Sequence, residues 1–291
     1  MYWSDGLHDY KQHHIINKEH YIDYKLTIAG DIPYNSFEDI ILSNFEGNQL
    51  PINLLYSGGI DSEFVLVMLK KLKIKFSVIT MKLVYDNLIL NTQDVYYSEK
   101  FCRHNGIKQK FIDLDLKKFY ESGDYKNYIT TYSIKSAYLA SQFWLLSQLD
   151  GFNIIGGNYF WPHFEKKNPV LSPMTYGSNF HQKFMTDNNI RGIGNMLSHS
   201  YAINYRLIQE HKKFVIKAQK IDAKDIKRKV YKNLSEVNLE VRNISHGWEN
   251  KDIFNVTKFD LPNNLFKYCQ IIWDDNIKTL LETSLTENHL R

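Results

Sequence analysis

The residues with the clearest chemical potential are the six at positions 57–62, Ser-Gly-Gly-Ile-Asp-Ser. Gly58 and Gly59 can adopt positive φ and let a ligand approach the backbone without meeting a Cβ. Successive N–H groups in such a turn form an anion pocket, and a helix that starts behind it adds unpaired N–H groups. The two serines contribute hydroxyl donors, and Asp61 can hold a Mg²⁺ ion that bridges phosphates. Together these residues predict a polyphosphate-binding turn.

The elements around this turn predict a parallel sheet. A short apolar stretch at 52–57 is typical of a buried strand, and an amphipathic helix is expected at 62–72. Further helices are expected at 36–46, 92–106 and 133–151, and further strands at 74–83, 108–116 and 152–160. Alternation of strands and helices indicates a doubly wound α/β fold, whose ligands bind beyond the carboxyl ends of the strands. The turn at 57–62 and the glycine pair that follows the strand at 152–160 are therefore expected to line one crevice.

The motif Ser-Gly-Gly-x-Asp-Ser directly after an apolar strand resembles the signature of the PP-loop ATP pyrophosphatases. All of residues 57–62 match it, and the α/β organisation around it spans roughly residues 36–160. The family includes asparagine, argininosuccinate, NAD and GMP synthetases, tRNA-lysidine synthetases, and several thiolases and reductases. The resemblance implies a Rossmann-like fold of the HUP type, ATP and Mg²⁺ as cofactors, and cleavage of ATP between its α- and β-phosphates.

The resemblance also implies roles for particular residues. Pyrophosphate would be held by Ser57, Gly58, Gly59, Ile60, Asp61 and Ser62. Asp61 would bind the metal and, with the two serines, act in catalysis. Adenine would contact backbone groups at Ile79, Thr80 and Met81, and the turn Gly156-Gly157-Asn158 would lie near the phosphates.

The chain departs from the asparagine synthetases after the second glycine turn. Those enzymes carry acidic residues there, whereas residues 158–167 read NYFWPHFEKK. Glu165 is the nearest carboxylate and the expected second metal ligand, if there is one. The same aromatic segment is either a packed loop or a substrate lid in which Lys166 or Lys167 neutralises phosphate charge.

In this family a substrate oxygen attacks the α-phosphorus, and a nitrogen or sulfur nucleophile then displaces AMP. We therefore expect a ligase- or amidotransferase-like enzyme that adenylates a carboxylate or amide-type oxygen of a small molecule. Its organisation is nearest to the synthase domain of asparagine synthetases. No N-terminal cysteine nucleophile precedes the turn, so no glutaminase domain is expected.

Two alternatives remain. The segment 211–232 carries nine Lys or Arg against two Asp. It is either a solvated helix face or the phosphate-binding surface of an enzyme that modifies tRNA or a nucleobase. A non-catalytic nucleotide-binding module is the second alternative, and the missing acidic pair after Gly157 favours it.

The rest of the chain is less informative. Residues 1–35 are expected to form an N-terminal extension, 36–180 the ATP-binding core, and 181–291 a mainly helical region that sets specificity. Helices are expected there at 198–214, 223–234 and 265–285, with a loop at 242–264. Two cysteines without a CxxC pair and histidines without ligand spacing argue against a disulfide framework and a zinc site. No membrane span or signal peptide is evident, so a cytoplasmic protein is expected. The resemblance allows a homodimer.

Overall fold

The computed structural model describes residues 2–4, 8–14, 20–26, 36–132, 137–157, 162–165, 168–171, 178–199, 201–215, 223–240 and 271–272. Within them, no helix combines the length and the apolar character needed to cross a membrane.

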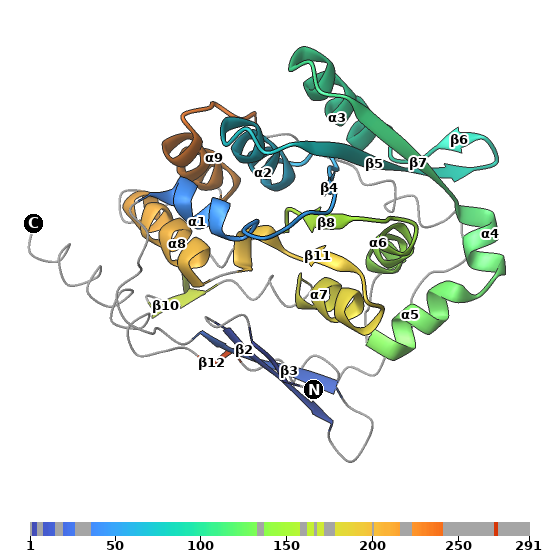
Figure 1. Cartoon of the computed structure of the whole chain (residues 1–291), viewed down its shortest axis with the longest axis horizontal. Coiled ribbons are helices and arrows are strands. Elements are labelled where there is room, and N and C mark those ends of the chain that lie inside the picture. Colours follow the sequence, from blue (N-terminus) through green and yellow to red (C-terminus); the bar gives the residue numbers. More distant parts are fainter. Residues whose placement is uncertain are drawn as a thin grey trace, which may run out of the picture.

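A parallel sheet forms the centre of the fold (Figure 1). Its strands are β4 (Ile52–Leu55), β5 (Phe76–Tyr85), β7 (Gln109–Asp115), β8 (Phe152–Ile155) and β11 (Arg191–Ile193). The order across the sheet is β7-β5-β4-β8-β11, all parallel, and the short β6 (Leu88–Ile89) pairs antiparallel with the end of β5. In chain order this is third, second, first, fourth, fifth, so the direction of winding reverses between β4 and β8. The chain has the expected Rossmann-like α/β fold, with its switch point at β4 and β8.

Two hydrophobic cores flank the sheet. One gathers side chains of α1 (Phe37–Ser43), α2 (Ile60–Lys71), α3 (Thr92–His104), α8 (Tyr201–Val215) and α9 (Ala223–Ser235). The other gathers those of α4 (Leu116–Glu121), α5 (Asp124–Tyr132), α6 (Ala137–Ser147) and α7 (Ser178–Asp187). Because successive strand residues point to opposite faces, Leu54 belongs to the first core and Leu55 packs against the second.

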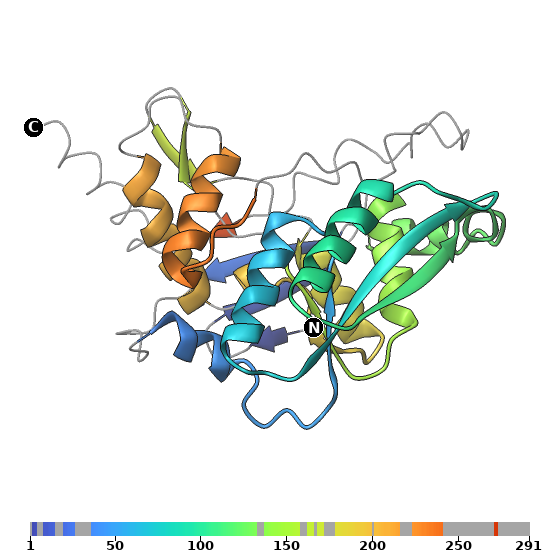
Figure 2. The ribbon, with the colours of Figure 1, turned by 90° about the horizontal axis from the view of Figure 1, so that it is seen from above.

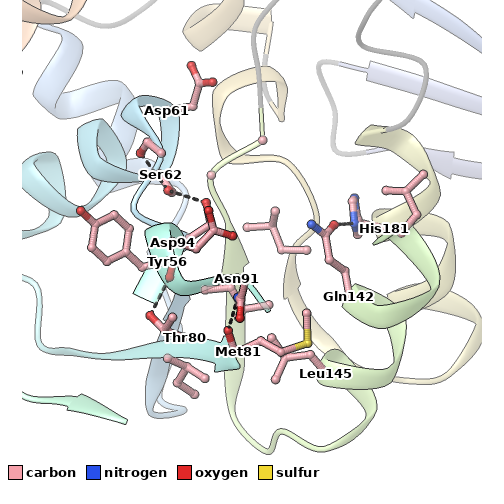
Figure 3. Close-up of a pocket in the computed structure, with 18 of the residues that line it drawn as sticks. Tyr56, Asp61, Ser62, Thr80, Met81, Asn91, Asp94, Gln142, Leu145 and His181 are labelled. Carbon is pink, nitrogen blue, oxygen red and sulfur yellow. Dashed lines mark hydrogen bonds between the residues drawn. The ribbon is translucent and has the colours of Figure 1, made fainter. Parts of the chain in front are cut away.

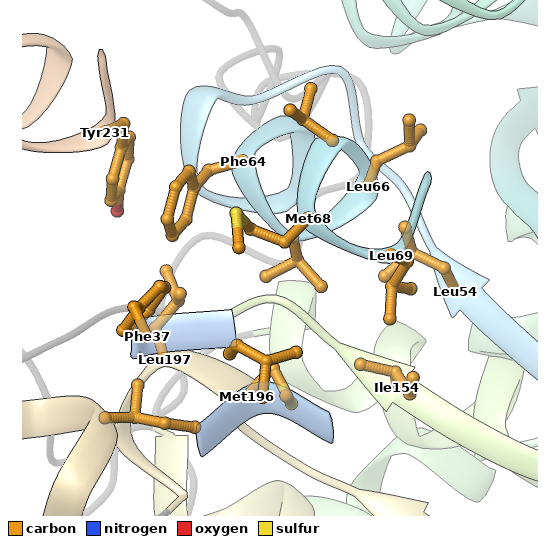
Figure 4. Close-up of a cluster of buried hydrophobic side chains, with 14 of the residues drawn as sticks. Phe37, Leu54, Phe64, Leu66, Met68, Leu69, Ile154, Met196, Leu197 and Tyr231 are labelled. Carbon is orange, nitrogen blue, oxygen red and sulfur yellow. The ribbon is translucent and has the colours of Figure 1, made fainter. Parts of the chain in front are cut away.

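Helix α9 packs beside α2 and α8, as both overall views show (Figures 1 and 2). The rings of Phe64 on α2 and Tyr231 on α9 stack with centroids 4.2 Å apart and an interplanar angle of 9° (Figure 4). Both side chains are fully buried. This aromatic contact brings α9, which contains residues 223–232 of the basic segment, against the helix that follows the turn at 57–62.

Ten expected elements are confirmed. They are the helices at 36–46, 62–72, 92–106, 133–151, 198–214 and 223–234, and the strands at 52–57, 74–83, 108–116 and 152–160, with shifted bounds. Helix α2, for example, begins at Ile60 rather than at Ser62. The strand β11 lies within 181–291, so the central sheet extends into the region expected to be mainly helical. The loop at 242–264 lies outside the described residues.

The prediction of a helix at 265–285 is wrong for residues 271–272, the part of this range that the structure describes. Ile271–Ile272 form β12, which pairs in parallel with β3 (His20–Leu26). Two adjacent β-branched residues favour a strand when a free strand edge is at hand, and that edge outweighs the local helical periodicity. The same small sheet contains β1 (Tyr2–Ser4) and β2 (His8–His14), two strands that the sequence did not predict. A hairpin of β9 (Pro162–Glu165) and β10 (Asn168–Leu171) was also unexpected.

The central strand β4 should dominate stability. Leu54 is fully buried, so Leu54→Ala should lower the free energy of unfolding by about 2–5 kcal/mol through lost burial and the cavity left behind. Leu50→Ala just before the strand is the control, because Leu50 is 43% exposed and should cost well under 1 kcal/mol. Urea denaturation measures both. Equal losses would show that β4 is not the centre of the core.

Candidate functional site

A cavity of about 360 Å³ opens at the carboxyl ends of β4 and β8, at the switch point of the sheet (Figure 3). Residues from three of the predicted segments, which are far apart in the sequence, are among those that line it. The predicted residues in its wall are Ser57, Gly59, Asp61, Ser62, Ile79, Thr80, Met81, Gly156 and Gly157. The volume is in the range of small-molecule sites.

Gly58 and Ile60 are not among the residues that line this cavity, and for Asn158 and Glu165 the structure does not describe the side chain. Gly58 has φ +75°, and a Cβ there would lie 2.9 Å from the carbonyl oxygen of Asp94, so this glycine packs the turn against α3. Ile60 packs against the first hydrophobic core. Asn158 lies outside the described residues. Glu165 ends β9, and its side chain also lies outside the described part of the chain.

The start of α2 is open to an anion. Gly59 is the N-cap residue, and no side chain caps the helix. The hydroxyl of Ser62 donates to the carbonyl oxygen of Gly59 at 3.0 Å and lies 3.5 Å from the Ser57 hydroxyl. The first N–H groups of a helix have no intrahelical acceptor and carry partial positive charge. The turn therefore presents backbone donors and two hydroxyls to one side of the cavity.

The Asp61 carboxylate is held by α9. The ammonium of Lys227 lies 3.0 and 3.1 Å from its two oxygens, and the Tyr231 hydroxyl also donates to it. The Lys227 side chain is 9% exposed and that of Asp61 is 26% exposed. The basic segment 211–232 thus sends at least one cation inward, to the turn, rather than to solvent. Sequence reasoning identified the segment but not this pairing.

The carboxylates present suit a metal that arrives with phosphates. The described residues contain no group of three or more His, Cys, Asp or Glu side chains that could enclose a metal ion. Mg²⁺ in nucleotide sites is held by one or two carboxylates, waters and the phosphates themselves. Asp61 and the buried Asp94 of α3 line the same cavity and fit that pattern.

The backbone of β5 is less available than expected. The carbonyl of Ile79 accepts from the N–H of Tyr56 at 2.8 Å. The side-chain amide of Asn91 donates to the Met81 carbonyl and accepts from the Leu83 N–H, both at 2.8 Å. Asn91 therefore bridges two backbone groups at the edge of the strand where adenine was expected. Its position just before α3 gave no sequence signal for this role.

The wall opposite β5 comes from α6 and α7. Leu139, Gln142 and Leu145 of α6 and His181 of α7 line the cavity. His181 is buried, and its Nε2 atom bonds to the Oε1 atom of Gln142. These residues were missed because α6 reads as a helix without a motif, and α7 was not predicted.

The glycine pair after β8 is required by close packing. A Cβ on Gly156 would lie 2.8 Å from the Cα of Ser62, and one on Gly157 would lie 1.9 Å from Oδ1 of Asn195. Real Cβ atoms do not approach other atoms this closely. The two glycine turns therefore touch, and together they form the floor of the cavity.

The thiol of Cys102 takes no part in the site. Burial in α3, with a smaller effect of the nearby Glu63 charge, raises its pKa to about 11. A thiol that stays protonated at neutral pH is a poor nucleophile. Cys102 is a small buried side chain of the first core.

No protein-family model matches the sequence, and no curated protein matches it either. Among solved structures, a predicted subunit of a tRNA methyltransferase from Methanocaldococcus jannaschii is 20% identical over 55% of this chain and 74% of its own, with a TM-score of 0.32. The tRNA thiolase NcsA from Methanococcus maripaludis, solved with its 4Fe–4S cluster, is 14% identical over 84% of this chain and 78% of its own, with a TM-score of 0.32. Neither comparison shows the expected likeness to asparagine synthetases, and neither is close enough to transfer a function.

The contact between the two turns should control ligand binding. Gly156→Ala should push the turn after β8 away from Ser62 and lower the affinity for pyrophosphate or ATP at least tenfold. Gly47→Ala is the control, since Gly47 has φ +73° and nothing within 4 Å of an added Cβ. It should strain the backbone without affecting binding. Unchanged affinity of Gly156→Ala in titration calorimetry would contradict this account of the cavity floor.

The buried His211 of α8 should make stability depend on pH. Burial, and secondarily the charge of Lys227, lowers its pKa from 6.5 to about 3. In the unfolded chain His211 takes up a proton as the pH falls below 6.5, whereas in the folded chain it stays neutral down to about pH 3. This contribution to the free energy of unfolding is therefore full above pH 6.5 and is lost as the pH drops toward 3. Between pH 7 and pH 5 the loss should be about 2 kcal/mol. His211→Leu should remove this part of the slope in urea titrations at the two pH values, and an unchanged slope would contradict it.

Proposed function

We propose that the chain is an ATP-dependent adenylating enzyme that cleaves ATP to AMP and pyrophosphate. The observation that carries the proposal is the convergence of the turn at 57–62, β5 and the turn at 156–157 on one cavity at the switch point. A simple mononucleotide site would not need two hydroxyls, an uncapped helix start and a carboxylate at one end. A polyphosphate with a metal needs all of them.

In this proposal the turn binds the leaving group. The N–H groups at the start of α2 and the hydroxyl of Ser57 hold the β- and γ-phosphates, and the Ser62 hydroxyl joins them when it turns from the Gly59 carbonyl, to which it donates in this structure. An oxygen of the acceptor attacks the α-phosphorus, the bond to the bridging oxygen breaks, and pyrophosphate departs with its electron pair. A nitrogen or sulfur nucleophile then attacks the activated carbon of the adenylated acceptor, and AMP leaves with the electron pair of the carbon–oxygen bond. The backbone N–H donors are fixed in place before the reaction, so they stabilise the developing charge without reorganisation. Holding both reactants in one cavity supplies a large part of the rate.

Charge balance explains why Asp61 and Lys227 face each other. Asp61 would hold Mg²⁺, which neutralises phosphate charge when bound. Lys227, whose ammonium is 3.0 Å from Asp61, would then face a phosphate oxygen instead. Each group exchanges one partner of opposite charge for another, so neither is left buried and unpaired. That exchange avoids the cost of several kcal/mol that an uncompensated buried charge carries.

Two classes of acceptor fit this proposal, which gives it two versions. One is a carboxylate or amide oxygen of a small molecule, activated for attack by a nitrogen nucleophile. The other is a nucleobase oxygen in tRNA, bound through cations of the segment 211–232. Lys213 and Lys232 are exposed in that segment, which supports the tRNA version. The two solved structures named above are a predicted subunit of a tRNA methyltransferase and a tRNA thiolase, and the tRNA version is in keeping with them.

The test is to incubate the protein with Mg²⁺ and α-³²P-labelled ATP, with either tRNA or a pool of small carboxylic acids, and to separate the nucleotides. With ammonium or sulfide added as the nucleophile, labelled AMP should appear with one acceptor class. Asp61→Asn should lower the rate at least 100-fold, and should also cost about 1–3 kcal/mol of stability because Lys227 loses its carboxylate.

Asp113→Asn is the matched control, since Asp113 is exposed on β7, away from the cavity. It should leave AMP formation unchanged. Formation of ADP, or full activity of Asp61→Asn, would overturn the proposal. Nucleotide binding without turnover on any acceptor would favour the non-catalytic module.

A further inference from the structure

We propose that Gln142, oriented by His181, reads the base of the bound nucleotide and selects adenine over guanine. The proposal rests on the proposed function, because it assumes that the cavity holds a nucleotide with its phosphates on the turn at 57–62. It adds specificity-determining residues at the opposite wall, contributed by α6 and α7.

Other groups of the protein already occupy part of the edge of β5 that adenine would use. The amide of Asn91 already donates to the Met81 carbonyl and accepts from the Leu83 N–H. This is the pair of bonds that a base edge would make with a strand. The Ile79 carbonyl is also bonded, to the N–H of Tyr56. Polar side chains on the opposite wall are therefore better placed than this strand edge to distinguish one base from another.

Few polar side chains in the described wall are placed for that task. The Thr80 hydroxyl donates to the Tyr56 carbonyl at 2.6 Å and accepts from Gln109 at 2.7 Å. Asp94 belongs to the phosphate end, since its carbonyl oxygen would lie 2.9 Å from a Cβ on Gly58. Gln142 is half-buried on the far side, and its amide nitrogen is turned toward the cavity in Figure 3.

His181 fixes which way the Gln142 amide faces. An amide oxygen only accepts, so His181 donates through Nε2 to Oε1, and the amide NH₂ group is turned away from His181. The imidazole is itself held, with its ring edge-on to Phe143 at a centroid distance of 5.6 Å. The locked amide thus offers the cavity one donor and the second lone pair of Oε1.

This pattern suits adenine and opposes guanine. A Gln amide can pair with the N7 acceptor and N6 donor of adenine, whereas guanine presents two acceptors, N7 and O6, at the same edge. Guanine O6 would then face Gln142 Oε1, two acceptors without a proton between them. Around this amide the wall is apolar, with Leu139 and Leu145 on α6 and Ile155 at the end of β8. Such side chains pack against the faces of a flat base.

The test compares the affinities for ATP, GTP and inorganic pyrophosphate, each with Mg²⁺, by titration calorimetry on the full chain. Gln142→Met keeps the length of the side chain and removes both polar atoms. It should weaken ATP binding roughly tenfold and bring the ATP and GTP affinities close together, with pyrophosphate binding unchanged. His181→Phe keeps a ring against Phe143. It should reduce the ratio of ATP affinity to GTP affinity, because the Gln142 amide is then free to rotate.

Gln148→Met is the matched control, because Gln148 is exposed just beyond the end of α6. It should behave as the unaltered chain. An unchanged ATP-to-GTP ratio in Gln142→Met would overturn the inference while leaving the proposed function intact. Equal losses for ATP and pyrophosphate would mean a structural role and overturn it as well. If the unaltered chain binds neither ATP nor pyrophosphate, the proposed function fails first and this inference with it.

Discussion

The close approach of two glycine turns is the constraint on which the site depends. The turn after β4 and the turn after β8 meet where Gly156 lies against Ser62, with no room for a Cβ. Adjacent parallel strands bring their carboxyl ends together, but only glycine allows the two backbones to come this near. The contact places the start of α2, which has no side-chain cap, beside the second turn, so that both form the floor of the cavity. The cavity above that floor is a result of this packing.

The second organising feature is the pairing of Asp61 with Lys227. The two residues are 166 positions apart, and the stacked rings of Phe64 and Tyr231 hold their helices together. Without its partner, either charge would lower the stability of the fold, because both side chains are so little exposed. As an ion pair they keep the turn in place. Helix α9 thereby becomes part of the site.

Local patterns were enough to predict the core of the fold and one end of the site. The motif at 57–62 and the alternation of strands with helices are short-range signals, and both led to residues that line the cavity. The partners of these residues could not be predicted in the same way. Lys227 lies in a segment whose charge suggested solvent or nucleic acid, and nothing in the sequence indicates that this one lysine turns inward.

The other end of the site shows the same limit. The Asn91 amide bridges backbone groups of β5, and Gln142 meets His181 from another helix. Such contacts depend on tertiary packing, which leaves no periodic trace in the sequence. The strand β12 is a further case, since its two isoleucines pair with β3, roughly 250 residues away along the chain. Where partners are distant, residue type alone does not reveal the role.

The central claim is that the turn at 57–62 holds the phosphates of a nucleotide. The most direct measurement is a crystal structure of the chain with Mg²⁺ and α,β-methylene ATP, which keeps its phosphates intact. The account predicts that the β- and γ-phosphates lie on the N–H groups at the start of α2, with Mg²⁺ on Asp61 and Lys227 turned to a phosphate oxygen. A nucleotide bound elsewhere, or one whose phosphates point away from the turn while Asp61 stays paired with Lys227, would contradict it.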